Sequence, residues 1–156
     1  MASFRTRIFQ SWFRLSRPMT LGVRAVMENE AGHVFMIRHT YTPGWYLPGG
    51  GVEKGETSLE SLERELLEEG GFTLNAAPDL VGIYSNQFVF PNDHVVLYRA
   101  PAGTWHQGKA TSIGEIAEAA WVDPRQPPEG TTPGTLARLM ELFADGPRSA
   151  YWAPKP

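Results

Sequence analysis

The sequence contains no cysteine, and that absence excludes several kinds of chemistry. Disulfide bonds, thiolate zinc sites and cysteine nucleophiles all need a residue that this chain does not have. Long apolar runs are also missing, since none approaches the roughly 20 residues that a membrane-spanning helix requires. We therefore expect no membrane span. The lack of disulfides favours a reducing compartment, which predicts a cytoplasmic protein.

An excess of positive charge is absent as well, because the net charge at pH 7 is −3. Nucleic-acid binding driven by bulk charge is therefore not expected. An anionic small substrate would need locally placed cations or metal ions in order to bind. The length of 156 residues, without a repeat of fixed period, favours a single domain that can bury a sizeable core.

The first acidic residue is Glu28, and the segment before it predicts an amphipathic helix over residues 4–17. Apolar and basic side chains fall on opposite faces of this helix: Phe4, Ile8, Trp12 and Leu15 on one, and Arg7, Arg14 and Arg17 on the other. We favour a helix docked on the body or on a second subunit, and the latter arrangement would be a homodimer. An Arg-rich, acid-poor start is also typical of an organelle transit peptide or of a helix on a membrane surface.

Short apolar runs separated by turn residues predict a mixture of strands and helices. Expected strands cover residues 21–27, 33–38, 80–90 and 95–100, with short extended pieces at 45–47 and 121–122, and expected helices cover 57–69 and 135–143. The first two strands flank a turn and are expected to pair as a hairpin. The mixture indicates an α/β or α+β sandwich. Its expected parts are the N-terminal helix at 1–18, one domain at 19–144 and a Pro-rich, loosely held tail at 145–156.

The most informative stretch runs from Gly50 to Phe72. Seven of the chain's 17 acidic residues fall within 53–69. Glycines allow the first part to turn sharply as a loop. Thr57 and Glu60 form a T-x-x-E capping box that starts a helix, and Gly70-Gly71 ends it.

Three glutamates share one face of this helix, because Glu65, Glu68 and Glu69 are spaced i, i+3 and i+4. Like charges at this spacing repel and weaken a helix, so a compensating cation is expected. Magnesium prefers a few carboxylates together with substrate phosphates. The alternative is a solvated acidic face with Arg64 and Lys54 as incidental partners.

The whole stretch resembles the Nudix box, G-x5-E-x7-R-E-U-x-E-E-x-G-U, in which U is a bulky apolar residue. The matching residues are Gly50, Glu56, Arg64-Glu65-Leu66, Glu68-Glu69 and Gly71-Phe72, so every fixed position is met. The lead-in over 45–50 also looks like that of the Nudix hydrolase family. A looser resemblance extends over 21–143, and it does not cover 1–17 or the tail.

The resemblance implies a mixed sheet between helices, with the box at the active site. It implies that Mg²⁺, or alternatively Mn²⁺, is held by the carboxylates of Glu65, Glu68 and Glu69, with the backbone carbonyl of Gly50 as a further ligand. Arg64 would orient the carboxylates by pairing with Glu56, because its planar fork suits bidentate contact with a carboxylate.

The reaction implied is attack of water on phosphorus in a pyrophosphate bond, which needs a carboxylate to take the proton of the water. Glu68 is our first choice for this base. Glu115 and Glu118, in the segment that leads into the last strand, are alternative candidates for the base. They fit equally well as ordinary acidic residues on the surface.

Substrate contacts are less well marked. Arg38, at the end of a strand, is a candidate for a phosphate contact. Trp45, Tyr46 and Phe88 are candidates for stacking on a base, although aromatic residues at such spacing more often belong to a core. No histidine has the spacing of a metal ligand, and we interpret His33, His39, His94 and His106 as structural.

The predicted function is hydrolysis of a nucleoside diphosphate linked to another group. Motifs outside the box that distinguish NADH-type and coenzyme A-type members are absent, so the substrate stays open among triphosphates, dinucleoside polyphosphates and nucleotide sugars. The alternative is a domain that binds a nucleotide without turnover, and such domains typically lack some box carboxylates. A prenyl diphosphate isomerase of this fold would need a catalytic cysteine.

Overall fold

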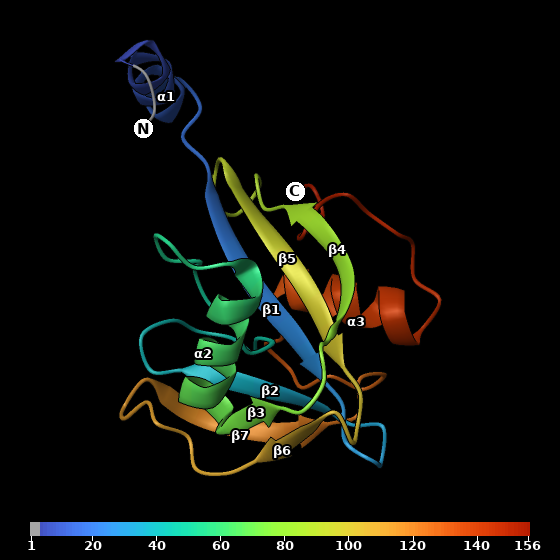
Figure 1. The fold of residues 1–156 in the computed structure, drawn as a ribbon. Helices are drawn as coiled ribbons and strands as arrows, with labels where there is room; N and C mark the ends of the chain where they lie inside the picture. The colour runs from blue at the N-terminus through green and yellow to red at the C-terminus, as the bar shows by residue number, and fades with distance from the viewer. Residues whose placement is uncertain (1–3) are drawn as a thin grey trace.

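The computed structural model describes residues 4–156, except for the side chain of Phe4. The predicted place of that side chain on the apolar face of the N-terminal helix therefore lies outside the described part of the chain. The elements in chain order are α1 (Phe4–Ser16), β1 (Thr20–Met27), β2 (Val34–His39), α2 (Ser58–Gly70), β3 (Phe72–Leu74), β4 (Asp79–Ser85), β5 (Asp93–Ala100), β6 (Trp105–Gln107), β7 (Ile116–Val122) and α3 (Pro133–Phe143). The expected mixed fold with an N-terminal helix is confirmed (Figure 1).

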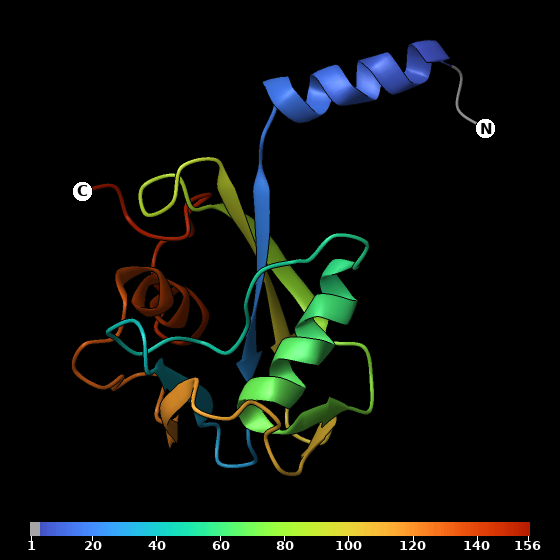
Figure 2. The same ribbon diagram turned by 90° about the vertical axis from the view of Figure 1, so that its left-hand side faces the viewer.

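The central sheet has the strand order β1-β5-β4, with β1 parallel to β5 and β4 antiparallel to it. Helices α2 and α3 lie on opposite sides of this sheet (Figure 2). Strands β2 and β7 form an antiparallel pair, and β3 and β6 form another. The sheet between helices that the sequence predicted is therefore present.

Side chains that alternate along β1 enter the two halves of the core. Val23, Ala25 and Met27 pack with Leu62 and Leu66 of α2. Val26, on the opposite face of the strand, packs in a second cluster with Leu139 of α3. This alternation follows from the two-residue period of a strand, and it fixes α2 against one face of the sheet.

The predicted hairpin of the first two strands is wrong. β1 pairs with β5, β2 pairs with β7, and a single bridge between Glu28 and Val34 joins the two expected partners. The turn itself is present, because the Asn29 side chain accepts hydrogen bonds from the backbone N–H groups of Ala31 and His33. Beyond the turn, both strands are buried and find partners far away in the sequence.

Two strand boundaries also differ from the prediction, by five residues each, and two short strands were not predicted. The expected strand at 80–90 ends at Ser85, since the backbone N–H groups of Val89 and Phe90 turn back onto the carbonyl of Asn86. The last strand begins at Ile116, five residues before the predicted start at Trp121. The three-residue strands β3 and β6 were not predicted at all.

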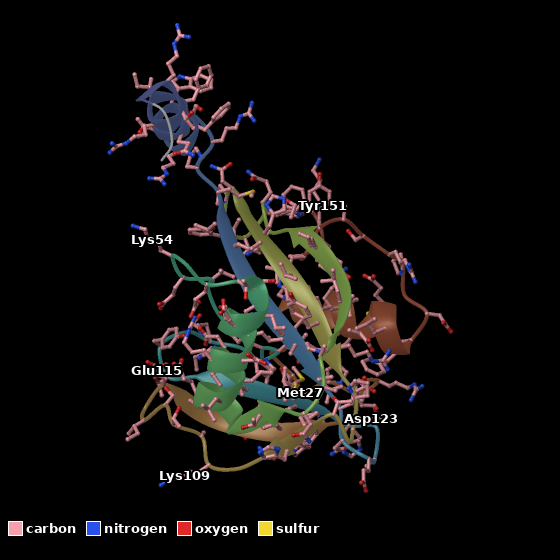
Figure 3. All side chains as sticks on the ribbon, in the orientation of Figure 1. Met27, Lys54, Lys109, Glu115, Asp123 and Tyr151 are labelled. Carbon is pink, nitrogen blue, oxygen red and sulfur yellow. The ribbon has the colours of Figure 1, made fainter. Side chains whose placement is uncertain are left out.

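The tail is not loosely held, contrary to the prediction. Trp152 is only 8% exposed and belongs to the core cluster under α3. Its backbone N–H donates to Ser85 O, and Arg138 of α3 donates to Tyr151 O. Figure 3 shows Tyr151 at the end of β4, where it forms one parallel bridge with Ser85.

Helix α1 stands away from the domain in both ribbon views (Figures 1 and 2). The expectation that it docks on the body of its own chain is therefore wrong. Within residues 4–156, no helix combines the length and the apolar character needed to cross a membrane.

Candidate active site

Helix α2 is defined by the end signals that the sequence predicted. The backbone N–H of Glu60 donates to Thr57 Oγ1 over 3.2 Å, and the N–H of Thr57 donates to Glu60 Oε2 over 2.7 Å. This reciprocal pair is the predicted capping box. The helix ends at Gly71, whose φ of 70° lies in the left-handed region and whose absent Cβ would stand 2.4 Å from Gly108 O.

The loop before α2 is held against β1 by its backbone. Val23 N–H donates to Gly50 O over 2.8 Å, and Ala25 N–H donates to Pro48 O over 3.0 Å. Gly49 has a φ of 139°, and a Cβ there would lie 2.0 Å from Val23 O. This close approach requires glycine, so the lead-in to the box has a direct structural cause.

Arg24 also shapes this loop, a role that was not predicted from the sequence. Its Nη1 donates to Leu47 O over 2.8 Å and to Gly49 O over 2.9 Å. A cation in the middle of an otherwise apolar strand was the available signal, because a charge in such a position needs partners.

The pairing expected between Arg64 and Glu56 is present and bidentate. Arg64 Nε donates to Glu56 Oε1 over 2.8 Å, and Nη2 donates to Oε2 over 3.0 Å. The remaining Nη1 donates to Glu65 Oε1 over 2.8 Å and lies 3.5 Å from Glu68 Oε2. Hydrogen bonds from Arg64 lower the pKa of Glu56 to about 2, so Glu56 stays ionised at any pH near neutrality.

Glu69 is the most buried of the three glutamates, with 6% of the residue exposed. Its Oε2 accepts from the backbone N–H of Gly49 over 2.7 Å, and its Oε1 lies 3.7 Å from His39 Nε2. Burial raises the pKa of Glu69 to about 8 despite the charge of Arg24 nearby. Burial also raises the pKa of Glu65 and lowers the pKa of His39.

Gly50 and Glu65 are in contact. A Cβ at Gly50 would lie 2.3 Å from Glu65 Oε1, so a larger residue at this position would displace the carboxylate. The Gly50 carbonyl, which was expected to be a metal ligand, accepts the hydrogen bond from Val23 and retains its second lone pair.

The chemistry of these groups suits a hard divalent cation. Within residues 4–156, no group of three or more His, Cys, Asp or Glu side chains is arranged to hold a metal ion as the side chains stand. Even so, all three donors are carboxylate oxygens, as such ions prefer. Burial makes the charged forms of Glu65 and Glu69 costly, and a bound cation offsets that cost.

The two later glutamates differ in their surroundings. Glu118 pairs with Arg38 over 3.1 Å on the exposed surface of β2 and β7. The charge of Glu115 is among the smaller causes, after burial, of the raised pKa of Glu69. Its backbone carbonyl accepts from Thr40 N–H over 2.9 Å. Glu115 therefore lies within electrostatic reach of the box.

A cavity of about 480 Å³ opens beside the box loop, between the start of β1, the turn after β4 and the start of α3. Residues from several segments line it: Thr20, Leu21, Arg24, Tyr46, Gly50, Gly51, Asn86, Phe90, Asp93, Pro133 and Trp152 among them. Its volume is that of a small-molecule site.

Of the predicted substrate residues, only Tyr46 lines this cavity. Trp45 is 8% exposed and packs in the core under α3, which is the alternative that the sequence left open. Arg38 lies over the Trp45 ring and pairs with Glu118. Phe88 packs on Tyr151. Trp152 was missed because nothing in the sequence indicates that the tail returns to the site.

The comparisons with known proteins agree with this geometry. A family model described as "NUDIX domain" matches residues 18–143. The "Putative 8-oxo-dGTP diphosphatase" of Bacillus subtilis (strain 168) is 32% identical over 125 residues, which make up 79% of each chain. The Homo sapiens "8-oxo-dGDP phosphatase NUDT18" is 30% identical over 134 residues, which cover 84% of this chain and 41% of the human protein.

Solved structures share the fold. The crystal structure of the MutT NUDIX hydrolase from Burkholderia pseudomallei matches with a TM-score of 0.66 at 21% identity. The match covers 80% of this chain and 98% of that one.

Proposed function

This chain belongs to the Nudix hydrolase family, and we propose that it cuts the pyrophosphate bond of a nucleotide or nucleotide derivative by metal-assisted attack of water on phosphorus. One observation carries the proposal. The Glu56–Arg64 pair holds Glu65 and Glu68 beside the buried Glu69. The loop before α2, which contacts these carboxylates, also lines the cavity through Gly50 and Gly51.

Mg²⁺, or Mn²⁺ in its place, would neutralise charge on the phosphates and make the attacking water more acidic. Its ligands would be Glu65, Glu68, Glu69 and the Gly50 carbonyl. The protein's part is to keep these oxygens on one side of α2. Arg64 does this by contacting Glu65 and Glu68 from one guanidinium nitrogen while it is anchored on Glu56.

Glu68 is the proposed base. Its side chain is 39% exposed, whereas those of Glu65 and Glu69 are 14% and 5% exposed. A base must exchange its proton with water during each turnover, and the most accessible carboxylate meets this need best. Glu115 is the second candidate, because its charge reaches Glu69.

The proposed substrate carries a nucleoside in the cavity and its phosphates at the box. The cavity offers apolar walls at Leu21, Phe90 and Trp152 and polar groups at Asn86 and Asp93. Nucleoside sites combine such walls with a few polar groups that fix orientation. The names of the Bacillus subtilis and human relatives favour oxidised guanine nucleotides as the first compounds to test.

The test is turnover of a panel of nucleoside triphosphates, their oxidised forms, dinucleoside polyphosphates and nucleotide sugars with magnesium. Glu68→Gln is expected to lower kcat by roughly 100-fold or more, because it removes proton transfer and a metal ligand. Glu63→Gln is the matched control, since Glu63 is exposed on the same helix and outside the site.

The products identify the phosphorus that was attacked. Equal activity of Glu68→Gln and Glu63→Gln would contradict the assignment of Glu68. Nucleotide binding seen by thermal shift, without turnover of any compound, would favour the non-catalytic binding module instead.

A further inference from the structure

Helix α1 presents a broad unpartnered apolar surface. We call the residues Ile8, Phe9, Trp12, Phe13 and Leu15 the apolar face of α1. Their exposed fractions range from 40% at Phe13 to 83% at Leu15. No strand or helix within residues 4–156 packs along α1, which stands apart from the domain (Figure 3). Exposed aromatic and aliphatic groups in such density mark an interaction site.

The aromatic side chains of this face contact one another. The ring centroids of Phe9 and Phe13 are 6.1 Å apart, and those of Trp12 and Phe13 are 5.1 Å apart. The Arg17 guanidinium lies 4.9 Å from the centre of the Phe13 ring. These contacts keep the face together as one surface with a cation at its border.

Charge on α1 and its linker is of one sign. Arg5, Arg7, Arg14 and Arg17 are the charged residues of 4–19, and no acid accompanies them. The rest of the chain then has 10 basic and 17 acidic residues, a net charge of −7. Positive charge is therefore concentrated on the one element that stands apart from the acidic domain.

At 100° per residue, the apolar face spans about half of the helix circumference. Arg7, Arg14 and, just after the helix, Arg17 occupy the other half, whereas Arg5 in the first turn falls within the apolar half. A helix covered by a second subunit would expose this other half to water, where nothing requires the charges to be all positive. An anionic lipid surface does require it, since headgroup phosphates attract arginines while the apolar half enters the acyl boundary.

We propose that α1 lies in the headgroup layer of an anionic lipid surface and tethers the hydrolase domain to it. The arrangement of the elements suits this role, because α1 runs across the direction of β1, so the helix can lie flat while the domain extends away (Figure 2). Repulsion between the acidic domain and the lipids is screened beyond roughly 8 Å at physiological salt.

The test is co-sedimentation of the full chain with phosphatidylcholine vesicles, with and without phosphatidylglycerol. Binding is expected only with the anionic lipid. Trp12→Glu should weaken it roughly tenfold or more, because a charge enters the acyl boundary. Replacing Arg7, Arg14 and Arg17 together by Gln should weaken it roughly a hundredfold. Ile113→Glu is the matched control, since Ile113 is 97% exposed on the domain, and it should bind like the unchanged chain.

Three results would overturn the proposal. One is the absence of binding to anionic vesicles, and another is equal binding by Trp12→Glu and Ile113→Glu. The third is a lipid-free dimer, seen by sedimentation velocity, that Trp12→Glu dissociates, since α1 would then be covered by a second copy. Turnover of a soluble nucleotide by Trp12→Glu at the unchanged rate shows that the variant is folded.

Discussion

Arg64 decides how the carboxylates of the box are arranged, because it contacts Glu56, Glu65 and Glu68 at once. Lysine keeps the charge and loses the planar fork. We expect Arg64→Lys to fold normally and to lower kcat by roughly 10- to 100-fold through misplaced ligands. Steady-state kinetics together with circular dichroism measures both quantities.

Arg99→Lys is the control for this change, because Arg99 forms a similar bidentate pair with Glu28 away from the box. It should leave kcat unchanged. Equal losses in the two variants would mean that Arg64 acts only through general stability.

Glu69 should make the stability of the metal-free protein depend on pH. Its pKa is about 8 in the folded chain, against a usual value of 4.5. Between these values the folded state binds more protons than the unfolded state, so the free energy of unfolding falls as pH rises through this window. Urea denaturation at a series of pH values, with a chelator present, should show this fall. It should be smaller in Glu69→Gln and unchanged in Glu63→Gln, and equal slopes in all three proteins would refute the assignment.

At the scale of single elements, α2 depends on its capping box. Thr57→Ala removes the acceptor for Glu60 N–H and should lower the free energy of unfolding by about 1 kcal/mol. Thr73→Ala, at an exposed position of β3, should change it by less than about 0.5 kcal/mol. Chemical denaturation measures the free energy of unfolding of both variants. Equal losses would mean that the cap does not contribute to stability.

The same element shows which features a sequence reveals. The cap at Thr57 and the stop at Gly71 depend on neighbours within four residues, so both were predicted correctly. The strand that pairs with β1 lies some 70 residues further along the chain. The hairpin prediction failed because it assumed that β1 pairs with the next strand in the sequence. At the site, the box residues were recognisable from their spacing. Arg24 carried one signal, its charge within an apolar strand, but its partners in the loop come only from the tertiary fold. The place of Trp152 at the cavity also comes only from the tertiary fold.

At the scale of the whole molecule, the C-terminal tail contributes one side chain, Trp152, both to the core and to the wall of the cavity. Trp152 packs on Tyr84, and a Cβ at Gly134 would lie 2.2 Å from its Nε1. We expect Trp152→Ala to lower the free energy of unfolding by about 3 kcal/mol through lost burial and a new void. The Michaelis constant should also rise, because the same side chain lines the cavity.

The same substitution at Trp12 provides the control, since that residue is 57% exposed on α1. Trp12→Ala should leave thermal and chemical denaturation nearly unchanged. A comparable loss of stability in the two variants would show that the tail contributes no more than an exposed helix.

The pairing of distant strands also has a consequence for the order in which the molecule assembles. Thr20 and Asp93 are joined across 73 positions of sequence, and Arg38 and Glu118 across 80. Closing such loops costs entropy before the contacts form, so the sheet is expected to fold slowly. Helix α2 uses local signals and can form early, whereas the loop that faces its glutamates hydrogen-bonds to β1 and must wait for the sheet. The loop is thus the part of the site with the least local support, and we expect mild denaturant to lower catalysis before helicity.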